Sequence, residues 1–358
     1  MATPTHDAAM LVSKAGRLSI QKLPTQSPGP NEILIDVKSI ALNPVDYYMR
    51  DSGFLLQDYP AIPGSDIAGT IAAVGADVPQ SSRGTLLRSG TRVAAYAVSI
   101  YTQGKPSYGA FQTKVLVPAD NVTPLPDTIS FNQGASLPMA VVTAWSGITT
   151  LDLSYDTKIN TTTTTTKKGL LVWGAASSIG LATVQIASKT LGLTVYAVAS
   201  PRHAEYLQSL GAAAVFDYHG APASVVTQII TAARAANVSL DLAFHATGDL
   251  QSAQEVIAAF TSDGADKGIV ATAVPMDASS PMTEGVDTRF ILPPPVEQGL
   301  RDRHFAFVFA RWLCPALDSG AFIPAPETHS VPAGLRGLDV ALDRLREGVS
   351  ALKLVVEL

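Results

Sequence analysis

The chain has 358 residues, of which 47% are hydrophobic and 15% charged, and its net charge is −5. This length and composition exclude wholesale disorder and favour two domains, and the absence of a long basic run argues against a nucleic-acid-binding protein. One cysteine, Cys314, excludes an intrachain disulfide, and the lack of a signal peptide or a long apolar stretch predicts a cytoplasmic protein with no membrane contact.

The first third of the chain has the pattern of a β-rich domain. Residues 32–40 and 91–96 alternate as strands do, and glycines and prolines between residues 60 and 75 mark turns. From residue 169 the pattern changes to short apolar strands at 169–174, 194–199, 213–216, 240–245 and 268–274, with helices expected at 179–191, 203–210 and 223–235. Strands alternating with helices predict an α/β fold with a doubly wound parallel sheet. The Thr161–Thr166 tract is expected to be an exposed loop.

The turn after the first of these strands is a candidate dinucleotide site. Small residues there let the backbone approach a pyrophosphate and point helix N–H groups at it. In register with G-x-G-x-x-G the chain keeps only the last glycine, so a merely tight turn stays an alternative. The residues assigned to the cofactor at this turn are Ala176, Ser177, Ser178, Ile179 and Gly180.

The end of the second strand of this domain discriminates between cofactors. NAD enzymes usually carry an acidic residue there, whereas NADP needs a donor or a cation for its 2′-phosphate. This chain has Ser200 and Arg202, and its first carboxylate is Glu205. We therefore predict NADPH, with Ser200 and Arg202 as ligands. The alternative, a helix-capping serine and a solvated arginine, is compatible with that role. Lys189 is a lesser candidate.

Several segments in the right order resemble the medium-chain dehydrogenase/reductase superfamily, and its zinc-independent fungal branch of quinone-oxidoreductase-like and trans-acting enoyl reductases in particular. The resemblance implies a GroES-like domain at 1–136, a Rossmann domain at 137–303 and a return to the GroES-like domain at 304–358. The segments that carry it are 41–46, 62–69, 109–112, 137–144, 210–212, 216–218 and 352–356.

The resemblance also implies roles for single residues. Asn43, Ser65 and Met139 occupy the places of the catalytic zinc ligands, and their side chains are poor zinc ligands, so we expect no metal. Thr143 is expected beside the nicotinamide, Tyr218 near the adenosine phosphate, and Asn43 in the substrate cleft, where it is a candidate catalytic residue. A helix threonine bonded to its own backbone, a half-buried strand-end tyrosine and an Asn-Pro turn are the respective structural alternatives.

Related fungal proteins often carry an aromatic residue and a lysine where this chain has Tyr47 and Tyr48. We assign Tyr48 a catalytic role, a hydrogen bond to the substrate carbonyl, with simple packing as the alternative. The resulting hypothesis is reduction by NADPH of an activated C=C bond, in an enone or a carrier-bound enoyl thioester, in secondary metabolism and with a polyketide synthase as partner. A non-redox step such as cyclisation and a non-catalytic NADPH-binding protein are the alternatives.

Overall fold

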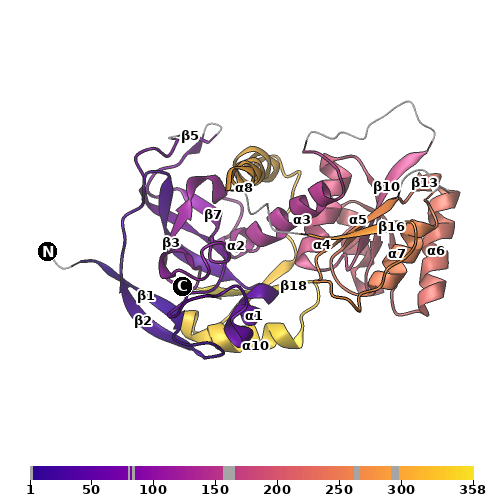
Figure 1. The fold of residues 1–358 in the computed structure, drawn as a ribbon. Coiled ribbons are helices and arrows are strands. Elements are labelled where there is room, and N and C mark those ends of the chain that lie inside the picture. Colours follow the sequence, from indigo (N-terminus) through magenta and orange to yellow (C-terminus); the bar gives the residue numbers. More distant parts are fainter. Residues whose placement is uncertain (1–2, 80, 83–84, 156–165, 262–266, 292–297) are drawn as a thin grey trace. The chain divides into compact units, whose positions relative to one another are not determined.

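The computed structural model describes residues 3–79, 81–82, 85–155, 166–261, 267–291 and 298–358 (Figure 1). The chain forms two compact units. The first unit comprises residues 1–139 and 298–358, and the second comprises residues 140–297. Residues 298–358 are called the return segment below, because they come back to the first unit after the second. Residues 161–165 of the threonine tract lie outside the described residues.

The first unit is built on a β-sheet with the strand order β17-β18-β3-β4-β7-β9, and β8 also pairs with β3. Its hydrophobic cluster lies between this sheet, the β1–β2 hairpin and α10. The predicted strands at 32–40 and 91–96 are β3 and β7. Its strands are β1 Thr5–Leu11, β2 Leu18–Pro24, β3 Glu32–Ala41, β4 Asp66–Val74, β5 Ser81–Ser82, β6 Thr85–Leu86, β7 Arg92–Tyr96, β8 Lys114–Pro118, β9 Val122–Pro124, β17 Glu327–Val331 and β18 Leu352–Glu357.

The helices of the first unit are mostly short, and among the described residues the return segment supplies five of the nine. In the return segment, β18 pairs with β3, so this late strand completes the sheet beside one of its earliest strands. The helices are α1 Pro44–Ser52, η1 Pro106–Tyr108, η2 Ala119–Asn121, α2 Phe131–Ala135, α8 Gln298–Phe305, the π-helix η5 Ala306–Leu313, α9 Cys314–Asp318, η6 Gly334–Gly337 and α10 Leu338–Glu347.

The second unit is a parallel sheet with the order β12-β11-β10-β14-β15-β16, which confirms the predicted doubly wound fold. The order reverses between β10 and β14, and helices α4 and α5 contact each other, as do α6 and α7 (Figure 1). Its strands are β10 Lys167–Trp173, β11 Thr194–Val198, β12 Ala212–Phe216, β13 Val238–Ser239, β14 Leu242–His245, β15 Gly268–Thr272 and β16 Val286–Phe290.

The helices of the second unit follow the predicted alternation. The helix expected at 179–191 is α4, whose last turns are wound as a π-helix, and the helix expected at 203–210 begins with a 3₁₀ turn. The helices are α3 Pro138–Thr150 (which starts at the end of the first unit), α4 Ser178–Gln185, η3 Ile186–Thr190, η4 Pro201–His203, α5 Ala204–Leu210, α6 Pro222–Ala235 and α7 Leu250–Ala258.

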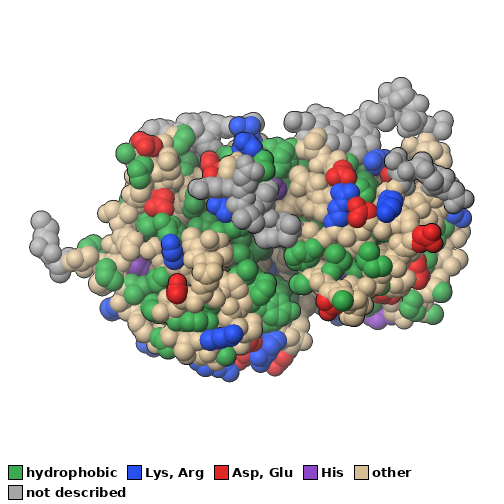
Figure 2. All heavy atoms as spheres, in the orientation of Figure 1, with side chains coloured by type: hydrophobic (Ala, Val, Ile, Leu, Met, Phe, Trp, Pro, Cys, Tyr) green, Lys and Arg blue, Asp and Glu red, His purple; other side chains and the backbone are tan. Residues whose placement is uncertain are grey.

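The described surface mixes charges of both signs. Figure 2 shows one face of the molecule, on which Lys and Arg side chains are interspersed with Asp and Glu. Among the described residues, none of the helices combines the length and the apolar character that a bilayer-spanning segment requires.

Candidate functional site

The loop after β10 has the geometry of a dinucleotide-binding turn. Gly174 has a φ of 75°, and a Cβ there would lie 2.8 Å from the Thr247 carbonyl oxygen. A Cβ on Gly180 would lie 2.5 Å from the Gly174 carbonyl oxygen, so helix α4 approaches the turn as closely as only glycine allows. The Ser177 hydroxyl accepts the Gly180 N–H at 3.1 Å and donates to the Gly174 carbonyl at 2.8 Å. Hydrogen bonds of the Ser177 side chain therefore stabilise the turn that precedes the N-terminus of α4.

The other predicted cofactor residues of this unit follow strands of the same sheet. Because β10, β11 and β12 are parallel, the Ser177 turn, Ser200 and Tyr218 all lie at the carboxyl edge of the sheet. Ser200 is half-buried at the start of η4, and the exposed Arg202 donates from Nε to His203 Nε2 at 3.1 Å. Tyr218 is 51% exposed. Ala176, Ser178 and Ile179 are half-buried in the turn.

Thr143 lies half-buried on α3. Three other hydroxyls of this helix, those of Ser146, Thr149 and Thr150, donate to backbone carbonyls three or four residues earlier. Within the described part of the chain, the Thr143 hydroxyl makes no such bond. The alternative role considered for it, a bond to its own helix, is therefore not present in this structure.

His245, at the carboxyl end of β14, borders the point where the strand order reverses. Its side chain is 1% exposed, with Nδ1 2.9 Å from the Thr272 hydroxyl and Nε2 3.3 Å from the Gly248 carbonyl. Burial lowers the pKa of His245, so the imidazole is neutral near pH 7. The contacts of His245 are those of a buried, hydrogen-bonded side chain.

In the first unit, the places of the superfamily's zinc ligands adjoin a buried polar cluster. Lys353 Nζ donates to Asn43 Oδ1 at 2.7 Å and to Asp66 Oδ2 at 3.2 Å. Asn43 Nδ2 donates to the same Asp66 oxygen at 2.9 Å, and the Met139 backbone N–H donates to the other at 2.7 Å. Asn43 is 5% exposed, and both polar atoms of its amide are engaged. We call Lys353, Asn43 and Asp66 the buried triad.

Two carboxylates in this region lie in the protein interior. Burial raises the pKa of Asp66, although Lys353 and the hydrogen bond from Asn43 act in the opposite direction. Burial also raises the pKa of Asp46, to about 7. Asp46 Oδ2 accepts the Asn43 backbone N–H at 2.7 Å, while its Oδ1 is buried without a partner among the described residues. Asp46 thus fixes the start of α1. Ser65 is also fully buried.

Tyr48 projects from α1 with 50% of its surface exposed. Its ring lies 4.4 Å from that of Tyr47 and 6.4 Å from that of Phe54, measured between centroids. Burial and then the adjacent Tyr48 phenol raise the pKa of Tyr47 to about 12. Tyr47 is therefore the inward member of the pair, packed against the hydrophobic cluster, and Tyr48 is the accessible one.

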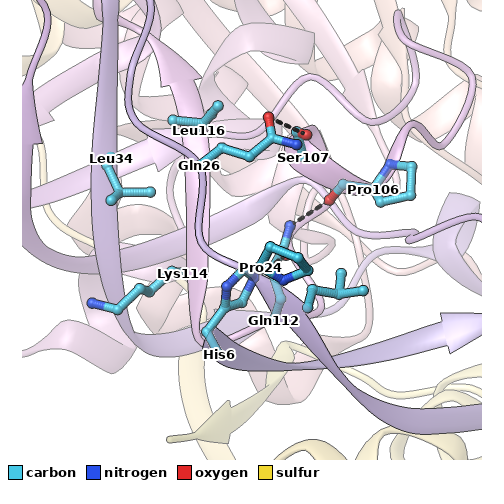
Figure 3. A pocket seen from close by; sticks show the side chains of 10 residues that line it. His6, Pro24, Gln26, Leu34, Pro106, Ser107, Gln112, Lys114 and Leu116 are labelled. Carbon is cyan, nitrogen blue, oxygen red and sulfur yellow. Dashed lines mark hydrogen bonds between the residues drawn. The ribbon is translucent and has the colours of Figure 1, made fainter. Parts of the chain in front are cut away.

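A separate pocket of about 130 Å³ lies in the first unit, beside the β1–β2 hairpin (Figure 3). Its polar side chains bond to one another, to nearby backbone or to adjacent side chains. His6 contacts Gln112 and Thr25 at 2.8 and 3.0 Å, and Gln112 donates to the carbonyls of Pro106 and Gly109 at 2.7 Å. None of the predicted site residues lines this pocket. It is thus distinct from both parts of the candidate site.

Sequence reasoning missed Lys353, Asp66 and Arg50, which is 2% exposed and bound to carboxylates. The sequence did contain a signal for these three residues, because each is a charged residue inside an otherwise apolar or helical segment. The partners of these residues, however, are distant in the sequence. Among the described residues, no group of three or more His, Cys, Asp or Glu side chains is arranged to hold a metal ion.

Comparison with known proteins places this arrangement in a family. Residues 29–127 match the alcohol dehydrogenase GroES-like domain. A trans-enoyl reductase of Aspergillus flavipes is 40% identical over 355 residues, with 99% of both chains covered. A trans-enoyl reductase of Aspergillus terreus is 46% identical over 67% of this chain and 77% of its own.

A solved structure shares the complete fold. An alcohol dehydrogenase superfamily protein from Novosphingobium aromaticivorans superposes with a TM-score of 0.76 at 21% identity, covering 99% of this chain and 100% of the other. The fold, the matched domain and the full-length similarity agree. The chain therefore belongs to the medium-chain dehydrogenase/reductase superfamily of nicotinamide-dependent oxidoreductases, among relatives that include fungal trans-enoyl reductases.

Proposed function

We propose that this protein is a zinc-independent, NADPH-dependent reductase of an activated C=C bond, in an enone or an enoyl thioester. The observation that carries the proposal is the full-length similarity to a protein named as a trans-enoyl reductase, together with the side chains at the metal-ligand places. Such relatives favour a carrier-bound acyl group as the substrate, and a polyketide synthase as the partner that carries it.

The first unit does not fit a zinc ion. Asn43, Ser65 and Met139 offer an amide, a hydroxyl and a thioether, whereas zinc in proteins is held by thiolate, imidazole or carboxylate. The Asn43 amide is already committed to the buried triad, and the cation there is the Lys353 ammonium. Alcohol–carbonyl interconversion in this superfamily relies on the metal as electrophile, whereas reduction of a conjugated C=C bond proceeds with hydrogen-bond donors at the carbonyl.

The second unit fits a dinucleotide. The glycine turn and the N-terminus of α4 supply close backbone approach and oriented N–H groups. When bound, NADPH supplies the hydride that the reaction consumes. We assign the pyrophosphate to Ala176, Ser177, Ser178, Ile179 and Gly180, the 2′-phosphate to Ser200 and Arg202, the adenosine end to Tyr218, and the nicotinamide to the Thr143 hydroxyl.

We assign Tyr48 the hydrogen bond to the substrate carbonyl, where negative charge develops during reduction. An exposed phenol suits this role, because a donor needs access to the substrate and need not lose its proton. The contacts of Asn43 favour a second assignment for that residue. With both amide atoms bonded inside the protein, Asn43 holds the start of α1, and through it Tyr48.

The test is NADPH oxidation with matched substrates. The panel contains a simple enone, an enoyl pantetheine thioester, the same enoyl group on a carrier protein, and simple alcohols with NADP⁺. We expect turnover of the enone or enoyl compounds, unaffected by a metal chelator. Turnover of alcohols alone, or its loss on chelation, would reverse the proposal. Conversion of a substrate without consumption of NADPH would indicate a non-redox reaction.

Cofactor preference gives a residue-level prediction. Arg202→Ala is expected to weaken NADPH binding about 10- to 100-fold, since a charge-assisted hydrogen bond contributes about 1.5–3 kcal/mol, and to leave NADH binding unchanged. Dissociation constants follow from the quenching of protein fluorescence. Arg234→Ala, another exposed arginine of the second unit, is the matched control. An unchanged NADPH preference in Arg202→Ala would remove this residue from the site.

A further inference from the structure

Helix α1, which carries Tyr48, is held at both ends by the return segment. At its start, Lys353 of β18 bonds to Asn43, the residue that precedes the helix. Near its end, the guanidinium of Arg50 reaches α10, where Nη2 lies 2.7 Å from Asp343 Oδ1 and Nη1 donates to the Asp339 carbonyl oxygen at 3.0 Å. The two attachments come from residues about 290–310 positions later in the chain.

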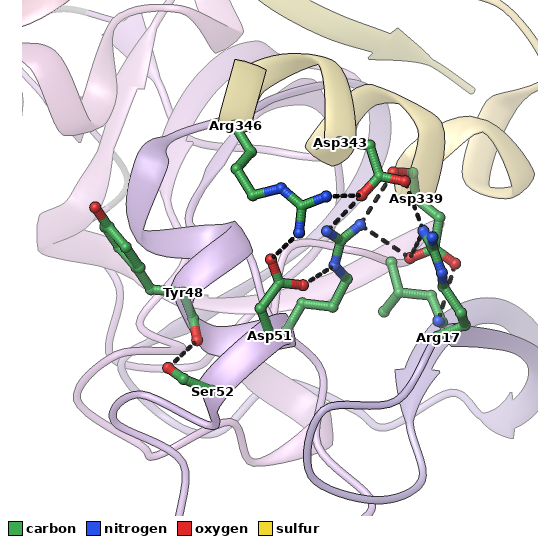
Figure 4. A network of polar contacts seen from close by, with 9 residues as sticks. Arg17, Tyr48, Asp51, Ser52, Asp339, Asp343 and Arg346 are labelled. Atoms are coloured by element: carbon green, nitrogen blue, oxygen red, sulfur yellow. Dashed lines mark hydrogen bonds and ion pairs between the residues drawn. The ribbon is translucent and has the colours of Figure 1, made fainter. Parts of the chain in front are cut away.

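Arg50 is the buried centre of a larger ionic network, in which three arginines meet three aspartates (Figure 4). Its side chain is 3% exposed, whereas those of Arg17 and Arg346 are 66% and 54% exposed. Within α1 itself, Arg50 Nε lies 2.6 Å from Asp51 Oδ1, and Arg50 holds the pKa of Asp51 below its usual range. A buried, multiply bonded guanidinium fixes the rotation of a helix more strictly than exposed pairs do, because its fork has a rigid planar geometry.

The rotation of α1 decides where Tyr48 points. Residues two apart in a helix project about 200° from each other, so burial of Arg50 turns Tyr48 outward. Figure 4 shows the Tyr48 ring pointing away from Asp51, Asp343 and Arg346. At the end of the helix, Gly53 takes a left-handed φ of 71°, and its N–H donates to the Met49 carbonyl. The helix is thus short, capped, and anchored on the face opposite Tyr48.

We propose that Arg50 is a positioning residue, which through Asp339 and Asp343 of the return segment sets the orientation of Tyr48 for the reaction. This inference rests on the proposed role of Tyr48 as the donor to the substrate carbonyl. Arg50 itself touches no reacting group. Its contribution is the placement of a side chain on the other face of its own helix.

The experiment compares Arg50→Lys with Arg17→Gln. Arg50 bonds to three carboxylates and one backbone carbonyl, and lysine keeps the charge but cannot bond to these four groups in fixed directions. Arg17 binds the same Asp343 and Asp339, and among the described residues it forms no ion pair with α1, which makes it the matched control. Asp343→Asn, on the partly exposed side of the network, replaces Arg50→Lys if that variant fails to fold.

We expect Arg50→Lys to lower kcat about tenfold with NADPH affinity unchanged, since small displacements of a catalytic group cost up to about 10²-fold in rate. In a Tyr48→Phe background the same substitution is expected to change kcat less than about twofold, because the hydroxyl that it misplaces is gone. Amide exchange of Gly53 and Phe54, which donate to the Met49 and Tyr48 carbonyls, is expected to accelerate in Arg50→Lys and not in Arg17→Gln.

The outcomes distinguish the positioning role of Arg50 from the donor role of Tyr48. Unchanged amide exchange in Arg50→Lys overturns the positioning role directly. Equal losses of kcat in the two backgrounds overturn it as well, because Arg50 would then act independently of the Tyr48 hydroxyl. If Tyr48→Phe alone turns over at the wild-type rate, the donor role of Tyr48 fails, and the exchange data alone decide whether Arg50 holds α1.

Discussion

Replacing Lys353 by methionine is expected to lower the free energy of unfolding by roughly 3–5 kcal/mol, the usual cost of removing one partner of a buried ion pair. The side chains of Lys353 and Asp66 are 4% and 0% exposed. Methionine has a similar length but gives no hydrogen bond, so Asp66 loses its counterion and the Asn43 carbonyl loses its donor. Urea denaturation followed by circular dichroism measures the change.

The surface pair between Lys114 and Asp36 supplies the control. It joins β8 to β3 in the same unit, but its side chains are 30% and 38% exposed. Lys114→Met is therefore expected to cost no more than about 1 kcal/mol. Asp66→Asn combined with Lys353→Met removes both charges and should restore part of the loss. Equal costs for the two lysine variants would show that the buried triad contributes no more than a surface contact.

Replacing Tyr48 by phenylalanine is expected to lower kcat for the enone or enoyl thioester by roughly 10²-fold, the lower end of the range for losing one oxyanion-type donor. The variant keeps the ring and its contacts with Tyr47 and Phe54, so NADPH affinity should not change. The measurement compares kcat and the NADPH dissociation constant of Tyr48→Phe with those of the wild type. A donor that acts mainly in the transition state affects kcat.

Tyr47→Phe is the control for the prediction on Tyr48. The half-buried Tyr47 ring packs against the hydrophobic cluster, and its pKa is raised to about 12, so its hydroxyl is a poor acid near pH 7. We expect wild-type turnover in this variant. A loss confined to Tyr47→Phe would move the role to that ring, and wild-type turnover in Tyr48→Phe would leave Tyr48 as a packing residue.

Much of the fold was accessible from the sequence, because its determinants are local. Apolar runs separated by helical spacing predicted the parallel sheet of the second unit, and Gly174 and Gly180 stand where the backbone needs them. The π-helical turns at Ile186–Thr190 were not predictable in this way. Their backbone bonds span five residues instead of four, and over so short a segment the side-chain pattern barely records that difference.

The candidate site was less accessible, because its decisive contacts join distant segments. Asn43 was placed in the substrate cleft by the family resemblance, but nothing local indicated that Lys353 would engage its carbonyl. Likewise Arg50 has no nearby sequence signal for Asp343, 293 residues later. A charged residue in an apolar strand indicates that it has a partner of opposite charge or a hydrogen-bond partner. Only the tertiary structure shows which residue that partner is.

The pairing of Asn43 with Lys353 also orders events during synthesis on the ribosome. The second unit is continuous in sequence, so its sheet is complete once residue 297 has emerged. The carboxylates of Asp46 and Asp66 leave the ribosome early, and Lys353 follows Asn43 by 310 residues. At synthesis rates of about 5–20 residues per second, that interval is roughly 15–60 s. Throughout this interval, β3 lacks its partner strand β18 and Asp66 of β4 lacks the Lys353 ammonium. The first unit, whose synthesis begins first, is therefore the unit whose folding is completed last.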